Sequence, residues 1–361
     1  MLVDNFFTST FNLEKEKQEV IDFIQMKKNQ NSAEAVFYDK YYEIQECINQ
    51  QFTIAKLKSK LWDGTDISEI CPWAFQVETK EQLDDWRYLI RFTSSFKNVS
   101  NPGRNMKFLV EDKTTGKYLG ALTVTSDFGD LGARDKYIGW SRDDRYKNKK
   151  LNNVACGQAI IPIQPFGYNF LGGKLMALMI TSDVIRNVWE CSYGDTLVGM
   201  TTTSLYGTYS QYNGMSTFKK IGKTTGKMPI ILPKEVIRVW EEYFGEKRVT
   251  RSNLDIKIYR ECGMKVKDYQ SGMQRGIYFC PFYDNTKEFL RGEIEKSSLI
   301  LSKKFVNYND YIINWWKHRA IRRYEKLKSE DRLITKLHFW DKLFGLSYKE
   351  AKQNYLGEVG R

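Results

Sequence analysis

Residues 158–179, QAIIPIQPFGYNFLGGKLMALM, decide the fold class. The apolar run 159–163 predicts a buried strand, and the prolines and glycines after it predict a turn. A helix is predicted to begin within residues 171–174. A strand that leads through glycines into a helix aims backbone N–H groups and the positive end of the helix dipole at the turn. Such a turn suits a phosphate or pyrophosphate, although Gly172 and Gly173 would equally allow the helix to pack closely on a sheet.

Composition indicates a folded, basic protein. The 361 residues are 42% hydrophobic and 14% aromatic, which predicts a packed core of two or three domains, or one core with extensions. No run of about 18 apolar residues predicts a membrane span, and no secretory signal opens the chain, so we expect a cytoplasmic protein. The six scattered cysteines fit reduced thiols. The net charge of +12 favours a polyanionic partner.

Histidine occurs only at His318 and His338. That excludes an HExxH metal site and argues against histidine-dependent nucleophilic catalysis in the main body.

Around the opening stretch, the pattern predicts a mixed α/β sheet covered by helices. Residues 1–85 are expected to be largely helical, with an amphipathic helix at 13–26. Residues 79–92 are predicted to form a further helix with Thr79 as N-cap. Residues 107–111 and 118–125 predict a hairpin that turns at Gly116. Further strands are expected at 195–203 and 275–279, and further helices at 210–221, 229–246 and 287–291.

The C-terminal segment carries an excess of positive charge. Residues 296–342 contain 12 Lys and Arg residues against five Asp and Glu residues. Residues 309–328 predict one helix with an apolar face and a basic face. The apolar face comprises Ile313, Trp316, Ala320, Tyr324 and Leu327, and the basic face comprises Trp315, Arg319, Arg322, Arg323 and Lys326. The basic face would suit a phosphate backbone, with Trp315 able to stack; a merely solvated charged face is the alternative.

Several motifs together resemble the DruA-like domain family of bacteria and phages, known from the Druantia anti-phage system. They are GRNMKFLVED (103–112), YLGAL (118–122) and ARDKYIGWS (133–141), followed by Arg145, by Asn152 and Asn153, and by RGIYFCPFYDNTKEFLRG (275–292). The resemblance covers residues 86–292. It implies a core domain at 86–292, between an N-terminal helical region (1–85) and a basic helical extension (293–361). It also implies a phage or anti-phage role with protein partners.

The order of elements is also similar to the GNAT acyltransferase fold, to which the phage DNA-modifying protein Mom is related. In that fold a Q/R-x-x-G-x-G/A turn binds the pyrophosphate of coenzyme A. Gln164 and Gly167 match this motif, whereas Asn169 stands at the last glycine. The resemblance implies acetyl-CoA or another acyl-CoA bound at Gln164, Gly167, Gly172, Gly173 and Lys174.

Candidate catalytic residues follow from that resemblance. Asp135 would act as a base, and Tyr206 or Tyr212 would protonate the thiolate, with Asn213 beside Tyr212 on the helix expected at 210–221. An ion pair with Arg134 or Arg145 is the alternative role for Asp135, and packing is the alternative for the tyrosines. Arg134 and Arg145 are also candidates for contact with nucleic acid.

Two functions therefore stand side by side. The first is a Mom-like, acyl-CoA-dependent transferase that acts on nucleic acid, DNA rather than RNA. The second is a non-catalytic DNA-binding component of a phage or anti-phage defence system. A nuclease that holds Mg²⁺ at Asp127, Asp130 and Asp135 is a more distant alternative, because nothing in their spacing demands a metal.

Overall fold

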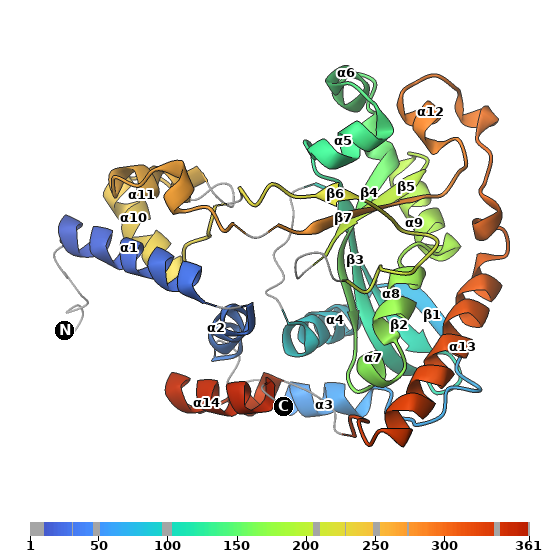
Figure 1. Ribbon diagram of the computed structural model, residues 1–361, viewed down its shortest axis with the longest axis horizontal. Helices are drawn as coiled ribbons and strands as arrows, with labels where there is room; N and C mark the ends of the chain where they lie inside the picture. The colour runs from blue at the N-terminus through green and yellow to red at the C-terminus, as the bar shows by residue number, and fades with distance from the viewer. Residues whose placement is uncertain are drawn as a thin grey trace, which may run out of the picture. The chain divides into compact units, whose positions relative to one another are not determined.

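The chain divides into two compact units. The computed structural model describes residues 11–30, 32–45, 51–95, 103–204, 210–227, 229–247, 253–272, 274–335 and 340–359. One unit combines Met1–Ala35 with Thr224–Gln274, and the other combines Val36–Lys223 with Arg275–Arg361 (Figure 1). The boundaries predicted after residues 85 and 292 both fall inside the second unit.

The second unit is built on a mixed sheet, which confirms the predicted mixed α/β class. Within the described residues the sheet has seven strands in the order β1-β2-β3-β4-β5-β7-β6. Their bounds are β1 (Pro72–Gln76), β2 (Asn105–Asp112), β3 (Lys117–Ser126), β4 (Val154–Pro162), β5 (Gly199–Thr203), β6 (Lys219–Lys223) and β7 (Gly276–Pro281). Neighbouring strands run antiparallel, except that β4 and β5 are parallel.

The predicted hairpin forms the second and third strands of this sheet. β2 pairs with β3, and Gly116 in the turn has a φ of +68°, a conformation that favours glycine. β3 is buried from Tyr118 to Thr125, as expected for a strand covered on both faces. β1 pairs with β2 and lies in the region expected to be largely helical, so that region also supplies an edge strand of the sheet.

β4 and β5 are paired over only part of their length. Three residue pairs join them, from Val154 with Gly199 to Cys156 with Thr201. Beyond these pairs, Thr202 Oγ1 donates to the Gly157 carbonyl (2.9 Å). Farther along, Gln211 Nε2 donates to the Ile160 carbonyl (3.3 Å). Beyond the point where the two strands stop pairing, side chains of β5 and of the segment after it therefore donate hydrogen bonds to the β4 carbonyls.

Helices cover both faces of the sheet (Figure 1). α4 (Lys80–Thr93) starts with the predicted capping box of Thr79 and Gln82. Trp86 of α4 donates its indole N–H to the Leu122 carbonyl of β3 (3.1 Å). α7 (Phe166–Asn169), α8 (Gly172–Met179), α9 (Asp183–Tyr193) and α13 (Tyr308–Ser329) lie on the other face.

The remaining helical segments of this unit are short or terminal. They are α3 (Gln51–Ser59), α5 (Gly132–Ile138), α6 (Arg142–Tyr146), η2 (Lys150–Asn153), α12 (Thr286–Leu290), η4 (Lys296–Ser298), η5 (Lys303–Phe305), η6 (Trp340–Leu343) and α14 (Tyr348–Val359). α2 (Ser32–Gln45) crosses the boundary between the units.

The helix predicted at residues 210–221 is wrong. Residues 211–214 form a turn, and residues 219–223 form β6, which pairs with β7. The ladder to β7 gives this segment backbone hydrogen bonds that its local sequence does not reveal.

The first unit is helical around one apolar cluster. It contains α1 (Leu13–Asn29), α10 (Lys234–Phe244), α11 (Asn253–Glu261) and η3 (Val266–Asp268). Val20 and Ile24 of α1 belong to the same buried cluster as Trp240 of α10 and Leu254 of α11. The amphipathic helix predicted at 13–26 is confirmed, and its apolar side faces residues more than two hundred positions away in the chain.

Candidate nucleic-acid-binding surface and the turn beside it

The turn between β4 and α8 uses its own backbone N–H groups. Gly167, Asn169 and Phe170 donate to the carbonyls of Ile163, Pro165 and Phe166, at 2.7, 2.9 and 3.0 Å. The Tyr168 N–H donates to the side-chain oxygen of Gln164 (2.9 Å). Four consecutive N–H groups are therefore bonded within the protein instead of facing a ligand.

The two glycines at the start of α8 allow close packing. A Cβ at Gly172 would lie 2.7 Å from the ring of Phe166. A Cβ at Gly173 would lie 2.6 Å from the Gln211 side-chain oxygen. In this structure the Gln211 side chain and the internal bonds of residues 167–170 occupy part of the turn, and binding of an acyl-CoA there stays a prediction.

Asn169, which departs from the glycine motif, holds the C-terminal chain in place. Its side chain is buried, donates to the Ile334 carbonyl (2.8 Å) and accepts from the Ile334 N–H (3.1 Å). The Asn169 side chain thus bonds to both backbone groups of Ile334, as a neighbouring strand would, in the segment that follows α13. No signal in the sequence identifies this contact.

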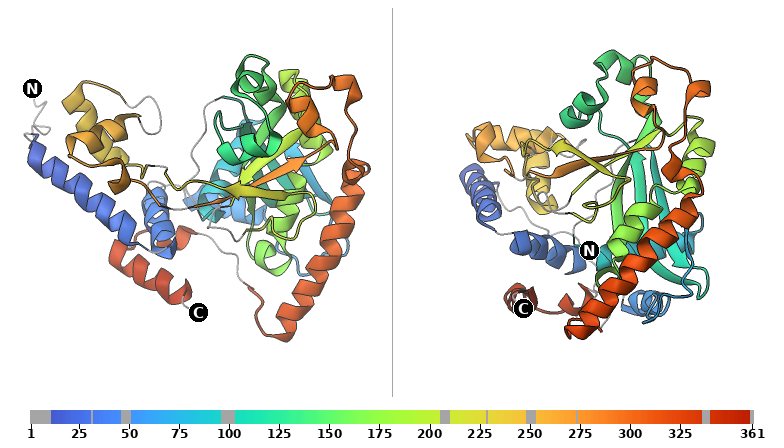
Figure 2. Two further views of the ribbon diagram at one scale, coloured as in Figure 1. Left: turned by 45° about the horizontal axis from the view of Figure 1, so that its top comes forward. Right: turned by 45° about the vertical axis from the view of Figure 1, so that its right-hand side comes forward.

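α13 packs its apolar face on the same turn. Trp316 donates its indole N–H to the Phe170 carbonyl (2.8 Å), and Tyr324 stacks on the Phe170 ring with centroids 4.6 Å apart. Trp316, Ala320 and Leu327 are buried as predicted, with Ile312 beside them, while Ile313 and Tyr324 are half-buried. Figure 2 shows the length of α13 alongside α7 and α8. The predicted two-faced helix is confirmed.

The other side of α13 presents the predicted cations. Arg319, Arg322 and Lys326 are exposed, and Trp315 and Arg323 are half-buried. The Arg319 guanidinium lies 4.2 Å from the centre of the Trp315 ring. Arg323 donates to the Tyr168 carbonyl (2.8 Å) and lies 4.8 Å from its ring centre.

Lys174 of α8 extends this charged region. Its ammonium group donates to the carbonyls of Gln211 (3.1 Å) and Asn213 (2.5 Å). Burial, and then the charge of Arg319, lower the pKa of Lys174. The structure therefore brings together one predicted cofactor residue and the predicted nucleic-acid-binding residues of α13. We call this set the α13 basic surface; it comprises Lys174, Trp315, Arg319, Arg322, Arg323 and Lys326.

The ARDKYIGWS motif forms a network of arginines and aspartates. Arg134 is fully buried and pairs with Asp127 (2.8 Å) and Asp135 (2.7 Å). Asp135 also accepts from the Trp140 indole (2.9 Å) and pairs with Arg145. Arg134 further donates to the carbonyls of two residues in the loop before α5. The network fixes that loop against α5 and α6.

This arrangement bears on several predicted roles. The ion pairs of Asp135 with Arg134 and Arg145, which the sequence left as an alternative, are present. Arg134 has no exposed surface and so no access to a phosphate in this structure, and Arg145 is mostly buried. Among the described residues, no three His, Cys, Asp or Glu side chains group as metal ligands. A catalytic role for Asp135 stays a prediction.

The remaining catalytic candidates contact other partners than Asp135. Tyr212 is buried, and its hydroxyl accepts from Gln211 (3.3 Å) and lies within hydrogen-bond distance of Thr202 Oγ1 (3.2 Å). Burial raises its pKa to about 12. Asn213 is exposed in the turn and accepts from the Tyr278 hydroxyl (2.8 Å). Tyr206 lies outside the described residues.

The fold and the surface define a class: mixed α/β proteins in which a helix after the last strand, α13, covers the β4–α8 turn and presents cations outward. The chain belongs to the DruA family, whose sequence profile, "Druantia protein DruA", matches residues 14–292. It is 26% identical over 320 residues to Druantia protein DruA of Escherichia coli (strain UMEA 4076-1), and the match covers 77% of each chain.

Two negative findings complete the description of the chain. No solved structure matches the chain. In the described residues, no helix has both the length and the apolar character needed to cross a bilayer.

Proposed function

We propose that this protein is a nucleic-acid-binding component of an anti-phage defence system. The defence role is taken from the DruA family. The α13 basic surface is the observation that carries the binding proposal. Among the described residues, Arg322 has no ion pair and Arg319 donates only to the Trp315 carbonyl of its own helix, whereas Lys326 pairs with Glu330 (3.7 Å). Exposed cations without acidic partners remain available to a phosphate backbone.

The physical basis is the release of counterions. Each phosphate that a lysine or arginine neutralises frees a condensed cation, so affinity falls steeply with salt. Arginine also binds phosphate in a bidentate manner, which a rigid helix can present at fixed spacing. Packing of α13 on α7 and α8 supplies that rigidity. We expect DNA to be the preferred nucleic acid, and other proteins of the defence system to be further partners.

Reversal of charge on α13 tests the binding proposal. Arg319→Glu with Arg322→Glu should weaken DNA binding and reduce the slope of log affinity against log salt by about two. Arg238→Glu with Arg260→Glu is a matched control, because both arginines are exposed on the helices of the first unit and the change in net charge is the same. Equal losses in the two variants, or an unchanged slope in the α13 variant, would remove the proposal.

A Mom-like acyl-CoA transferase is the second candidate. It is supported by the strand order, by the single parallel pair β4–β5 and by α8 between those strands, an arrangement that we interpret as GNAT-like. Against it stands the occupied turn at residues 164–174.

Thermal unfolding with acetyl-CoA separates the two candidates, because a ligand that binds the folded state must stabilise it. A rise in Tm at millimolar acetyl-CoA that disappears in Gly173→Gln would favour the transferase. An unchanged Tm would favour the first candidate, the nucleic-acid-binding component of a defence system.

A further inference from the structure

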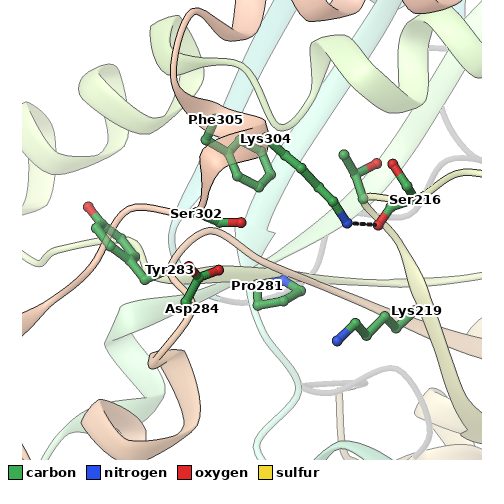
Figure 3. A pocket seen from close by; sticks show the side chains of 9 residues that line it. Ser216, Lys219, Pro281, Tyr283, Asp284, Ser302, Lys304 and Phe305 are labelled. Atoms are coloured by element: carbon green, nitrogen blue, oxygen red, sulfur yellow. Dashed lines mark hydrogen bonds between the residues drawn. The ribbon is translucent and has the colours of Figure 1, made fainter.

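A small polar pocket lies beside the N-terminal end of α13, where the Ser216 hydroxyl in its wall bonds to the Tyr311 hydroxyl (2.8 Å). It has a volume of about 120 Å³ and opens between β6, the end of β7 and the segment before α13 (Figure 3). Its walls are formed by Ser216, Thr217, Lys219, Pro281, Tyr283, Asp284, Ser302, Lys304 and Phe305. This volume is enough for several water molecules or for one group the size of a phosphate.

Two lysines approach the pocket from different segments. Lys219 extends from β6, and Lys304 extends from η5 (Figure 3). The ammonium group of Lys304 donates to the Ser216 carbonyl (2.8 Å), which orients it and leaves two of its protons for another acceptor. Asp284 is the carboxylate among the lining residues, so the walls carry a net positive charge.

A buried hydroxyl in the wall lacks a partner. Thr217 is 3% exposed, and its Oγ1 has no hydrogen-bond partner among the described residues. Buried polar atoms are almost always paired, so an unpaired one calls for an explanation such as a bound ion or ligand.

Arg186 adds positive charge next to the same wall. It is 9% exposed, and its guanidinium lies 5.4 Å from the ring centre of Phe305, which lines the pocket, and 5.2 Å from that of Phe282. Its Nε has no partner, and no ion pair of Arg186 occurs among the described residues. Glu190, one turn along α9, accepts from the Leu197 N–H instead. This buried cation is therefore left without a paired carboxylate, which favours an anion near by.

We propose that this pocket binds a phosphate group. Lys219 and Lys304 supply the charge, and the hydroxyls of Thr217 and Ser302 donate hydrogen bonds to its oxygens. The phosphate belongs either to a small molecule or to a nucleic-acid backbone, which offer the same chemistry. This inference is independent of the α13 basic surface.

Paired lysine variants test the proposal. Sodium phosphate should raise the Tm of the wild-type protein above its value in sodium chloride of equal ionic strength. Lys219→Gln with Lys304→Gln should weaken phosphate binding by about tenfold or more, because two charge-assisted hydrogen bonds are lost. Lys220→Gln with Lys303→Gln removes the same charge from exposed neighbours and should keep the response.

Two single substitutions should change the affinity for phosphate in opposite directions. Thr217→Val should lower phosphate affinity but leave the Tm without phosphate unchanged or higher, because it removes an unpaired buried hydroxyl. A purely structural Thr217 would instead lower that Tm. Asp284→Asn should strengthen phosphate binding, because it removes from the pocket wall a negative charge that repels phosphate.

The source of the phosphate is decided by three ligands. Inorganic phosphate, adenosine monophosphate and a single-stranded oligonucleotide are compared with both lysine pairs. A response to inorganic phosphate or to the monophosphate that depends on Lys219 and Lys304 supports a small-molecule site. A response to the oligonucleotide alone, with the same dependence, supports a backbone contact. Equal behaviour of the two lysine pairs with all three ligands, or no response of the wild-type protein, overturns the proposal.

Discussion

Asp135 is the residue on which the ARDKYIGWS segment depends most. Its carboxylate joins two arginines and the Trp140 indole, and it also accepts from the Leu131 N–H (3.2 Å) at the start of α5. A specific motif in the sequence thus marks a structural network. The charges of this motif pair with one another in the folded chain.

Asp135→Asn should destabilise the protein by about 3 kcal/mol, because it removes a charge from buried Arg134. Chemical denaturation measures the change. Asp130→Asn is the matched control, because Asp130 pairs with the same Arg145 (3.0 Å) but its side chain is 75% exposed. That variant should lose less than about 1 kcal/mol. Equal losses of unfolding free energy in the two variants would show that Asp135 does not hold this network together.

Tyr212 gives the protein a predicted sensitivity to alkali. Its pKa is raised by burial to about 12, above the unfolded value of 10.0, so the folded state holds the proton more tightly. The stabilisation is complete below pH 10 and is lost as the pH rises through about 12. Tyr212→Phe should cost about 1 kcal/mol at pH 7 through lost hydrogen bonds and should flatten the fall in stability above pH 10.

Urea unfolding at several pH values between 8 and 11.5 measures this effect. Tyr243→Phe is the control, because Tyr243 is 41% exposed and its substitution should change stability little at pH 7. An equally steep alkaline fall in Tyr212→Phe and in the wild-type protein would show that other groups are responsible.

At the scale of elements, α13 and the β4–α8 turn form one structural feature. The sequence predicts each separately, as an amphipathic helix and as a phosphate-binding turn. In the structure the helix covers the turn, and Asn169 bonds the chain that follows α13. The basic face is thereby presented by a helix held on the sheet, not by a free tail.

Asn169→Ala should loosen residues 332–335 without unfolding the sheet. The Ile334 amide loses its acceptor, so we expect its hydrogen exchange to become about tenfold faster or more. Hydrogen–deuterium exchange followed by mass spectrometry measures this. Asn148→Ala, which removes an exposed amide bonded to Asp144, should leave exchange at Ile334 as it is. Unchanged exchange at Ile334 in Asn169→Ala would contradict the anchoring role.

At the scale of the whole molecule, the chain assembles a helical unit from two distant segments. The segment between β6 and β7 supplies α10 and α11, and the N-terminus supplies α1. At the base of the insertion, the Gly272 N–H donates to the Gly226 carbonyl (3.1 Å). Both glycines have positive φ, +72° at Gly226 and +68° at Gly272, so side chains there would be strained.

Val20→Asp with Ile24→Asp should unfold the first unit selectively. Both residues are almost fully buried, and two unpaired carboxylates in an apolar cluster cost several kcal/mol, comparable with the whole stability of a small unit. We expect lost exchange protection in α10 and α11 and retained protection in β2–β4. Gln18→Asp with Gln25→Asp adds the same charge to exposed positions of α1 and is the control. Simultaneous loss of protection in the sheet would show that the units are one cooperative structure.

The sequence by itself determined the local elements whose signal is local. Periodicity gave α1, α4 and α13, turn chemistry gave the β2–β3 hairpin at Gly116, and the ARDKYIGWS motif led to the DruA family. Each depends on residues within a few turns or strands of one another, so pattern and propensity suffice.

Tertiary structure decided which partners those elements have. Residues 219–223 become a strand because β7 lies beside them, and Arg134 is buried because Asp127 and Asp135 neutralise it. Gln211 and Asn169 fill or cover the turn that the sequence offered to a pyrophosphate. These contacts join segments far apart in the chain. Local sequence shows that a backbone group or a charge requires a partner, but the partner lies far away in the chain and is brought close only by the tertiary fold.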